Sequence, residues 1–177
     1  MTQTWVSVIA SFLHLVAVAV YVGGSVAMEF VMSPAQKYVP PSQAQVIGQK
    51  SADRFLILVW SALALFPISG GLLFFSLSDQ NVVNGTKFFT TDYGRTLFAM
   101  IFLWFVLVIN GSLITFVYRP KLRQKVSSQR QGQDFSRTQK EMQKAAQIVS
   151  WITRIDLVIA VFIVLLGASM AYGSGLL

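Results

Sequence analysis

The 177-residue sequence contains no cysteine, and this absence excludes disulfides, thiolate metal sites and iron–sulfur clusters. It also contains a single histidine, His14, so one chain cannot supply two histidine ligands to a haem iron. Charged residues make up only 12% of the chain whereas 54% of it is hydrophobic, which leaves too little polar surface for a soluble domain. Any metal bound by this chain must therefore use histidine, methionine or oxygen ligands.

Hydrophobic residues are concentrated in four runs that are each long enough to cross a membrane as a helix. About 20 apolar residues span the hydrocarbon, and the runs occupy residues 5–31, 55–77, 96–118 and 151–172. None of the runs shows the period-two alternation of a transmembrane barrel, so helices are the only spanning structure left. The sequence therefore predicts an all-α fold, an integral membrane four-helix bundle in which residues 1–177 form one transmembrane domain. No lysine or arginine precedes the first run, so we expect no cleaved signal peptide there.

The 14 basic residues are distributed unevenly along the chain. Nine of them lie from Arg119 to Arg154 and three lie from Lys37 to Arg54, but only two lie between the second and third runs. By the positive-inside rule, residues 33–53 and 119–150 form cytoplasmic loops, residues 78–95 form the outer loop, and the N-terminus and C-terminus are both extracytoplasmic. This pattern predicts a multi-pass protein of the bacterial cytoplasmic (inner) membrane. The basic loops predict contact with anionic headgroups of the lipid bilayer and no nucleic acid partner.

Two of the loops contain local structural motifs. Ser136 is followed three residues later by Gln139, which is the spacing of a capping box, so we expect a cytoplasmic helix to begin there and continue into the fourth run. Asn84 and Gly85 lie between apolar residues, which is typical of a β-hairpin turn. The outer loop is therefore predicted to contain a small hairpin.

One face of the first run brings together several possible ligands. His14, Tyr21, Met28 and Met32 follow each other at helical spacing, so a histidine, a phenol and two thioethers share a stripe. Copper(I) favours imidazole and thioether ligands, and such a stripe could pass the ion along. The alternative is that these side chains only pack between helices, since methionine commonly fills gaps. His14 and Met28 lie about 21 Å apart along a helix, so a single metal site must recruit other helices.

Ionisable residues near the ends of the runs form a second group. Glu29, Arg54, Arg154 and Asp156 lie near the cytoplasmic boundary and are predicted to form structural ion pairs, with Arg54 bonded to Glu29 or Asp156. Arg154 and Asp156 are two positions apart, so we expect each to face a different helix. Paired charges at this depth could instead serve proton movement. Arg95 marks the outer end of the third run, where it either reaches the headgroups or meets an anion such as a haem propionate.

The spans as a set resemble the copper-resistance D (CopD) membrane domain and, more distantly, the HemJ-type protoporphyrinogen oxidases, which share the first-run histidine. Each of the four runs contributes to the resemblance. The matching segments are Leu13-His14-Leu15, Tyr21-Val22-Gly23-Gly24, Arg54-Phe55, Gly70-Gly71-Leu72, Tyr93-Gly94-Arg95, and Arg154 with Asp156. The resemblance implies a copper-related membrane protein.

The chain departs from both families at two positions. Members often have a lysine in the third run, where this sequence has Met100. If that lysine assists tetrapyrrole oxidation, its loss argues against an enzyme, whereas a methionine is compatible with copper. The acidic residue of the fourth run is Asp156 where glutamate is more typical, which shortens the side chain and keeps its charge.

Three functions remain open from the sequence. The first is copper transport or resistance of the CopD type, in which the predicted metal ligands are His14, Met28, Met32 and Met100. The second is binding of haem b or a porphyrin, with or without oxidoreductase activity, in which the predicted contacts are His14, Tyr21, Trp60, Trp104 and Arg95. The third is a structural subunit, either of a homo-oligomer or of a larger membrane complex, in which His14 only bonds between helices.

Overall fold

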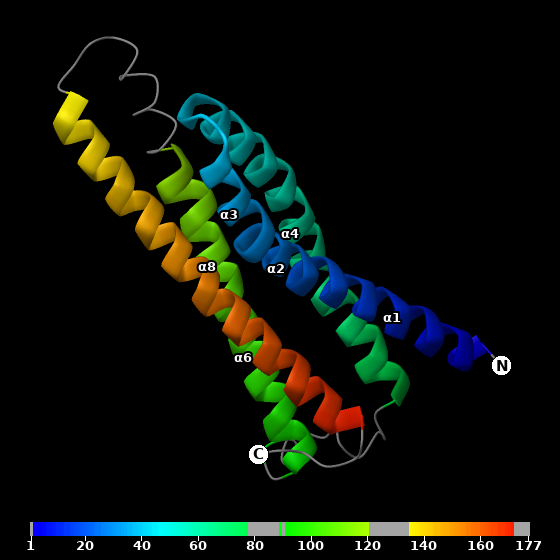
Figure 1. Ribbon diagram of the computed structural model, residues 1–177. Helices are drawn as coiled ribbons and strands as arrows, with labels where there is room; N and C mark the ends of the chain where they lie inside the picture. Colours follow the sequence, from blue (N-terminus) through cyan, green and yellow to red (C-terminus); the bar gives the residue numbers. More distant parts are fainter. Residues whose placement is uncertain (1, 78–88, 90, 121–134, 172–177) are drawn as a thin grey trace.

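The computed structural model describes residues 2–77, 89, 91–120 and 135–171 and consists of long helices (Figure 1). Four helical segments in the described part are long and apolar enough to cross a membrane, and they are Trp5–Tyr38, Val46–Ser76, Asp92–Tyr118 and Gln147–Met170. Many large apolar side chains remain exposed along them, including Phe12, Phe75, Phe102 and Trp151. Such surfaces fit a lipid environment, so the predicted all-α membrane bundle is confirmed.

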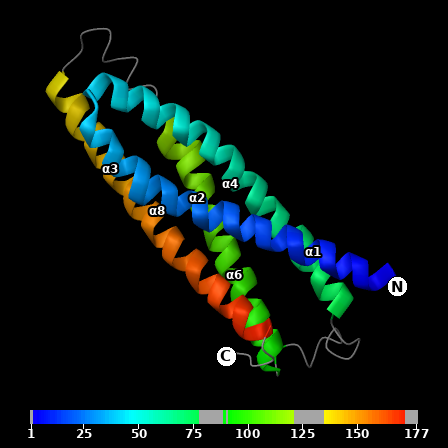
Figure 2. The ribbon, with the colours of Figure 1, turned by 45° about the vertical axis from the view of Figure 1, so that its right-hand side comes forward.

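The first span is one continuous helical rod whose hydrogen-bond pattern changes along its length (Figure 2). It begins with α1 (Thr2–Val18) and alternates between π-helical and α-helical turns before it ends in a short 3₁₀ turn. The later segments are η1 (Ala19–Gly23), α2 (Gly24–Val26), η2 (Ala27–Met32), α3 (Ser33–Ala35) and η3 (Gln36–Tyr38). Tyr21 lies in the π-helical turn η1 and Glu29 lies in η2.

The other spans are α4 (Pro41–Leu77), α6 (Asp92–Ser112) continued by η4 (Leu113–Tyr118), and α8 (Phe135–Ala171). Thr91 caps α6, since its hydroxyl accepts a hydrogen bond from the Gly94 amide. The expected helix that leads into the fourth span is confirmed, because α8 runs without a break from Phe135. The predicted hairpin at Asn84 and Gly85 lies outside the described residues.

Helices extend beyond the apolar runs on the side predicted to be cytoplasmic. The segment 33–53, expected as a loop, is helical except around Val39 and Pro40. Hydropathy locates only the part of a helix that lies in hydrocarbon, and polar residues in water can continue the same helix. The connection between the first two spans is therefore much shorter than expected.

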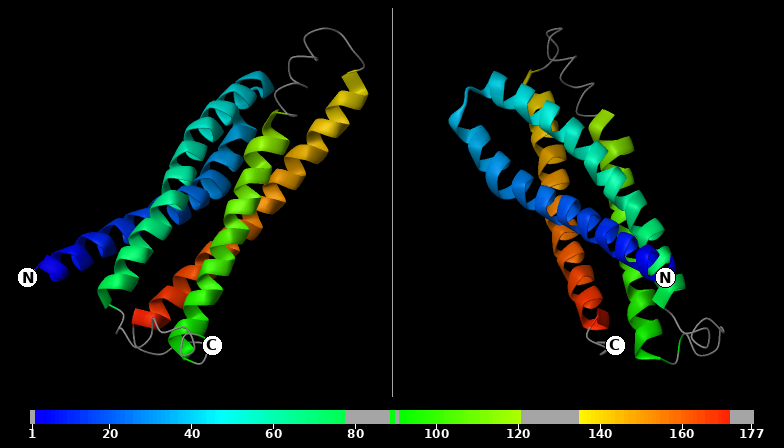
Figure 3. Two further views of the ribbon diagram at one scale, coloured as in Figure 1. Left: turned by 180° about the vertical axis from the view of Figure 1, so that it is seen from behind. Right: turned by 90° about the vertical axis from the view of Figure 1, so that its right-hand side faces the viewer.

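Two helix pairs make up the bundle, and they meet around a small core. The first span packs along α4, while α6 packs along α8. The N-terminal part of α1 diverges from α6 and α8, so the helices cross rather than run parallel (Figure 3). The core is built mostly of small residues and leucines where the pairs cross, and its buried members are Ala17, Tyr21, Ala62, Leu63, Leu107 and Ala160. Small residues allow helix backbones to approach closely in membranes.

Gly24 provides a direct test of this packing. A Cβ atom at Gly24 would lie 2.7 Å from Cε2 of Phe55 on α4, whereas a Cβ atom at the neighbouring Gly23 would meet nothing within 4 Å. We therefore expect Gly24→Ala to lower the free energy of unfolding by about 1–3 kcal/mol relative to Gly23→Ala, because the Phe55 ring must move. Unfolding in mixed micelles measures the difference. Combining Gly24→Ala with Phe55→Leu should restore stability, and equal effects of the two alanines would contradict the close contact.

Candidate functional site

His14 faces α4 rather than lipid. Its Nδ1 atom lies 2.9 Å from the hydroxyl oxygen of Ser69, and its ring meets the edge of the Phe66 ring at a centroid distance of 5.4 Å. Gly70 lies next to the imidazole, since a Cβ atom there would be in ordinary contact with Cε1 of His14 at 3.7 Å. Ser69 and Phe66 of α4 therefore hold the histidine in one orientation.

The hydrogen bonds of Ser69 determine which imidazole nitrogen is free. The Ser69 hydroxyl donates to the carbonyl oxygen of Leu65 at 2.7 Å, so its oxygen is left to accept from His14 Nδ1–H. The Nε2 atom of His14 then carries a lone pair and has no protein partner among the described residues. The described part of the chain has no side-chain nitrogen or oxygen that is both fully buried and without a partner, so Nε2 is not fully buried. This arrangement, with one nitrogen anchored and the other open, is the usual one for a metal-binding histidine.

The predicted methionine ligands are not gathered around His14. Met28 and Met32 lie partly buried further along the first span, at the spacing that the sequence predicts. Met100 lies between α6 and α8, where its Cε atom is 3.4 Å from the position of a Cβ on Gly167. Within the described residues, no group of three or more histidine, cysteine or acidic side chains could hold a metal ion. His14 is therefore not part of such a group in the part of the chain that the structure describes.

The aromatic residues predicted to line a cofactor pocket take part in contacts between helices. Tyr21 is buried in the core and meets the Phe66 ring at 6.2 Å. Trp60 Nε1–H donates to the Thr115 hydroxyl at 3.2 Å, and Trp104 Nε1–H donates to the carbonyl oxygen of Leu63 at 3.1 Å. Both indoles thus join α4 to the third span.

The bond from Trp104 has a specific cause in the sequence. In an α-helix the carbonyl of Leu63 would accept from the amide of residue 67, but Pro67 has no amide hydrogen. The carbonyl is left without its helical partner inside a membrane, where such a group is costly. The Trp104 indole supplies the missing donor.

We expect Trp104→Phe to lower the free energy of unfolding by about 1–3 kcal/mol, because it leaves the Leu63 carbonyl without a donor. The same substitution in a Pro67→Ala background should cost less, since alanine restores the amide within α4. A double-mutant cycle in detergent measures this coupling. Trp60→Phe is the control, because its partner is a hydroxyl that Pro67 does not affect. Equal costs in both backgrounds would show that Trp104 acts through packing alone.

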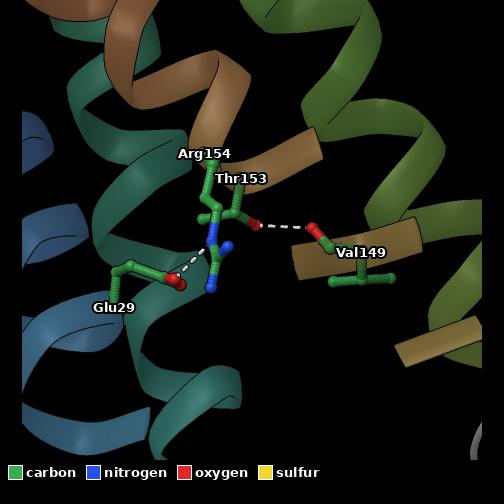
Figure 4. A network of polar contacts seen from close by, with 4 residues as sticks. All are labelled: Glu29, Val149, Thr153 and Arg154. Carbon is green, nitrogen blue, oxygen red and sulfur yellow. Dashed lines mark hydrogen bonds and ion pairs between the residues drawn. The ribbon is translucent and has the colours of Figure 1, made fainter. Parts of the chain in front are cut away.

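Two ion pairs join the helix pairs to each other. Arg154 on α8 donates from Nε to the Glu29 carboxylate on η2 at 2.6 Å (Figure 4), and Arg119 pairs with Asp53 of α4. One turn of α8 is further tied by the Thr153 hydroxyl, which donates to the Val149 carbonyl at 2.9 Å. The predicted partner of Glu29 was wrong, because Arg154 rather than Arg54 occupies that position.

Asp156 faces a different helix from Arg154, as their spacing predicts. It is buried in the bundle with 7% of its surface exposed, and the Asn110 amide of α6 donates to its carboxylate at 2.7 Å. The predicted bond between Asp156 and Arg54 was therefore wrong as well. At the other end of the bundle, Arg95 Nε donates to the Phe89 carbonyl oxygen at 3.3 Å.

The sequence interpretation missed Ser69 and the pair Asp53–Arg119. Ser69 is the only polar residue between Ser61 and Ser76, and it precedes Gly70. A lone hydroxyl beside a glycine in an apolar helix marks a place where a neighbouring polar group can approach. That pattern could have identified it.

The comparison with protein families matches residues 49–170 to the family described as copper resistance protein D. This range is more than half of the chain and includes α6 and Asp156, whereas the first span with His14 precedes it. No curated protein and no solved structure matches the chain.

Proposed function

Because this chain belongs to the copper resistance protein D family, we propose that it transports or sequesters copper within the membrane and that His14 is the ligand through which it binds the ion. The observation that supports this proposal is the open Nε2 atom of His14, whose ring is anchored through Nδ1 by Ser69. Imidazole nitrogen suits copper in either oxidation state, and thioethers favour copper(I). Met28 and Met32, on the same stripe, are the proposed ligands further along the path.

A single protein ligand fits transient handling better than permanent storage. Stored metal ions are held by several ligands of one site, and the described residues offer no such group around His14. An ion that is bound by one imidazole, and then by single thioethers further along the helix, can dissociate from each position. We therefore propose that copper is cargo for this chain rather than a resident cofactor.

The experiment that tests the proposal is a metal analysis and an absorption spectrum of the purified wild-type protein, before and after loading with copper(I). We expect the loaded protein to bind about one copper ion per chain at equilibrium, measured by competition with a copper(I) chelator, and to show no Soret band. A Soret band with iron would favour the haem interpretation instead. Protein that remains colourless and free of metal after loading would favour a structural subunit.

Both chain ends are proposed to lie outside a bacterial inner membrane, with the α8 extension in the cytoplasm. Because the chain has no cysteine, a single introduced cysteine reports its own side of the membrane. We expect a membrane-impermeant maleimide to label Asp92→Cys in intact spheroplasts and to label Lys144→Cys only after lysis. Both side chains are exposed, so access to the reagent is limited only by the membrane. The reverse labelling pattern would overturn the orientation.

A further inference from the structure

Asp156 lies within the fourth candidate membrane span, on a different helix from His14. It is nine residues after the start of the span Gln147–Met170, which corresponds to about 14 Å along the helix. Only 7% of its surface is exposed, and Ala160, one turn later on the same face, belongs to the core where the helix pairs cross. A carboxyl group therefore sits beside the apolar centre of the bundle.

No cationic side chain in the described part of the chain compensates Asp156. From α6 it receives one hydrogen bond, from the amide of Asn110, which cannot carry charge. From the first span, Tyr21 lies within electrostatic range of the carboxyl group. On its own helix, Arg154 turns to Glu29. The core residues of α4, among them Ala62 and Leu63, are apolar.

A buried carboxylate without a cationic partner is costly, and such a group takes up a proton or another cation. Ionisable residues inside a membrane are rare and usually serve ion or proton pathways. The Asn110 amide has both donors and an acceptor, so it can bond to the carboxyl group in either protonation state. We propose that Asp156, bonded to Asn110 and buried without a cationic partner, is a proton-binding site that exchanges its proton with water.

The position of Tyr21 connects this site to the rest of the first span. Tyr21 follows His14 by two helical turns, about 10 Å, and both rings meet the edge of Phe66. The bundle thus has two polar centres at different depths, one based on an imidazole and one on a carboxyl group. The proton site does not depend on copper, so it can be tested without any metal.

Infrared difference spectroscopy of the metal-free protein in detergent tests the proposal. A pH change should produce a carbonyl band of a protonated carboxylic acid in an apolar environment, and transfer to D₂O should shift that band to lower frequency. Asp156→Asn should lose the band, and Asp156→Glu should retain a titrating band at a changed frequency. Asn110→Leu removes the hydrogen bond, so we expect it to shift the frequency without removing the band.

Asp92→Asn is the matched control, because Asp92 is exposed at the start of α6 and its loss should leave the band unchanged. The response of the carbonyl band to pH and D₂O is measured on the wild-type protein. This part of the test therefore remains valid even if Asp156→Asn fails to fold. Three outcomes would overturn the proposal. They are a band that Asp156→Asn retains, a band that responds to neither pH nor D₂O, and a band that follows the sodium concentration at constant pH.

Discussion

Replacing His14 by alanine is expected to abolish stoichiometric copper binding while leaving the protein folded. His14 provides the only imidazole of the chain, and its Nε2 atom is the open ligand at the proposed site. The methionines of the stripe lie elsewhere on the helix and cannot replace it at that depth. Competition with a copper(I) chelator, followed by metal analysis, measures the loss. Copper retained at one ion per chain in His14→Ala would place the binding site elsewhere and contradict the proposal.

Substitution of Ser69 is expected to weaken copper binding without abolishing it. Ser69→Ala removes the acceptor that orients His14 Nδ1–H, and loss of such a supporting bond weakens metal binding by about 10- to 100-fold. Ser61→Ala is the matched control, because Ser61 also lies on α4 and donates to a carbonyl one turn back, that of Ile57. It is exposed and has no bond to His14. Equal effects of the two alanines on copper affinity would show that Ser69 does not orient the ligand.

The fold could be predicted from the sequence because hydropathy alone identifies helices in a membrane. The first three apolar runs are each followed by a segment with polar residues, and the four spans of the structure contain most of the predicted runs. The helical entry into α8 was predictable from the spacing of Ser136 and Gln139, which is a local pattern. These features depend on residues that are close in the chain.

The contacts between helices could not be predicted in the same way. Spacing shows that Arg154 and Asp156 face different directions, but the partner that each one meets depends on how the helices cross. Pro67 predicts an unpaired carbonyl at Leu63, and only the three-dimensional arrangement shows that Trp104 supplies the donor. The lone hydroxyl of Ser69 signals that a polar group lies nearby, but that this group is His14 appears only when α1 is placed against α4.

The ion pair between Glu29 and Arg154 should respond asymmetrically to the loss of either partner. The Glu29 side chain is 15% exposed, whereas that of Arg154 is 60% exposed. Arg154→Met therefore leaves a largely buried carboxylate without its cation, and we expect it to lower the free energy of unfolding by about 1–3 kcal/mol. Glu29→Gln leaves an arginine that can extend its long side chain toward the headgroups, so its cost should be smaller. Unfolding in mixed micelles measures both costs.

The double variant Glu29→Gln/Arg154→Met distinguishes the ion pair from packing. Once neither charge is present, no uncompensated carboxylate remains, so the double variant should be more stable than Arg154→Met alone. Arg54→Met is the matched control, since Arg54 is exposed on α4 and Glu29 bonds to Arg154 instead. A cost for Arg54→Met as large as that for Arg154→Met would contradict the observed pairing. Additive costs in the double variant would show that the two side chains stabilise the bundle separately, through contacts other than the bond between them.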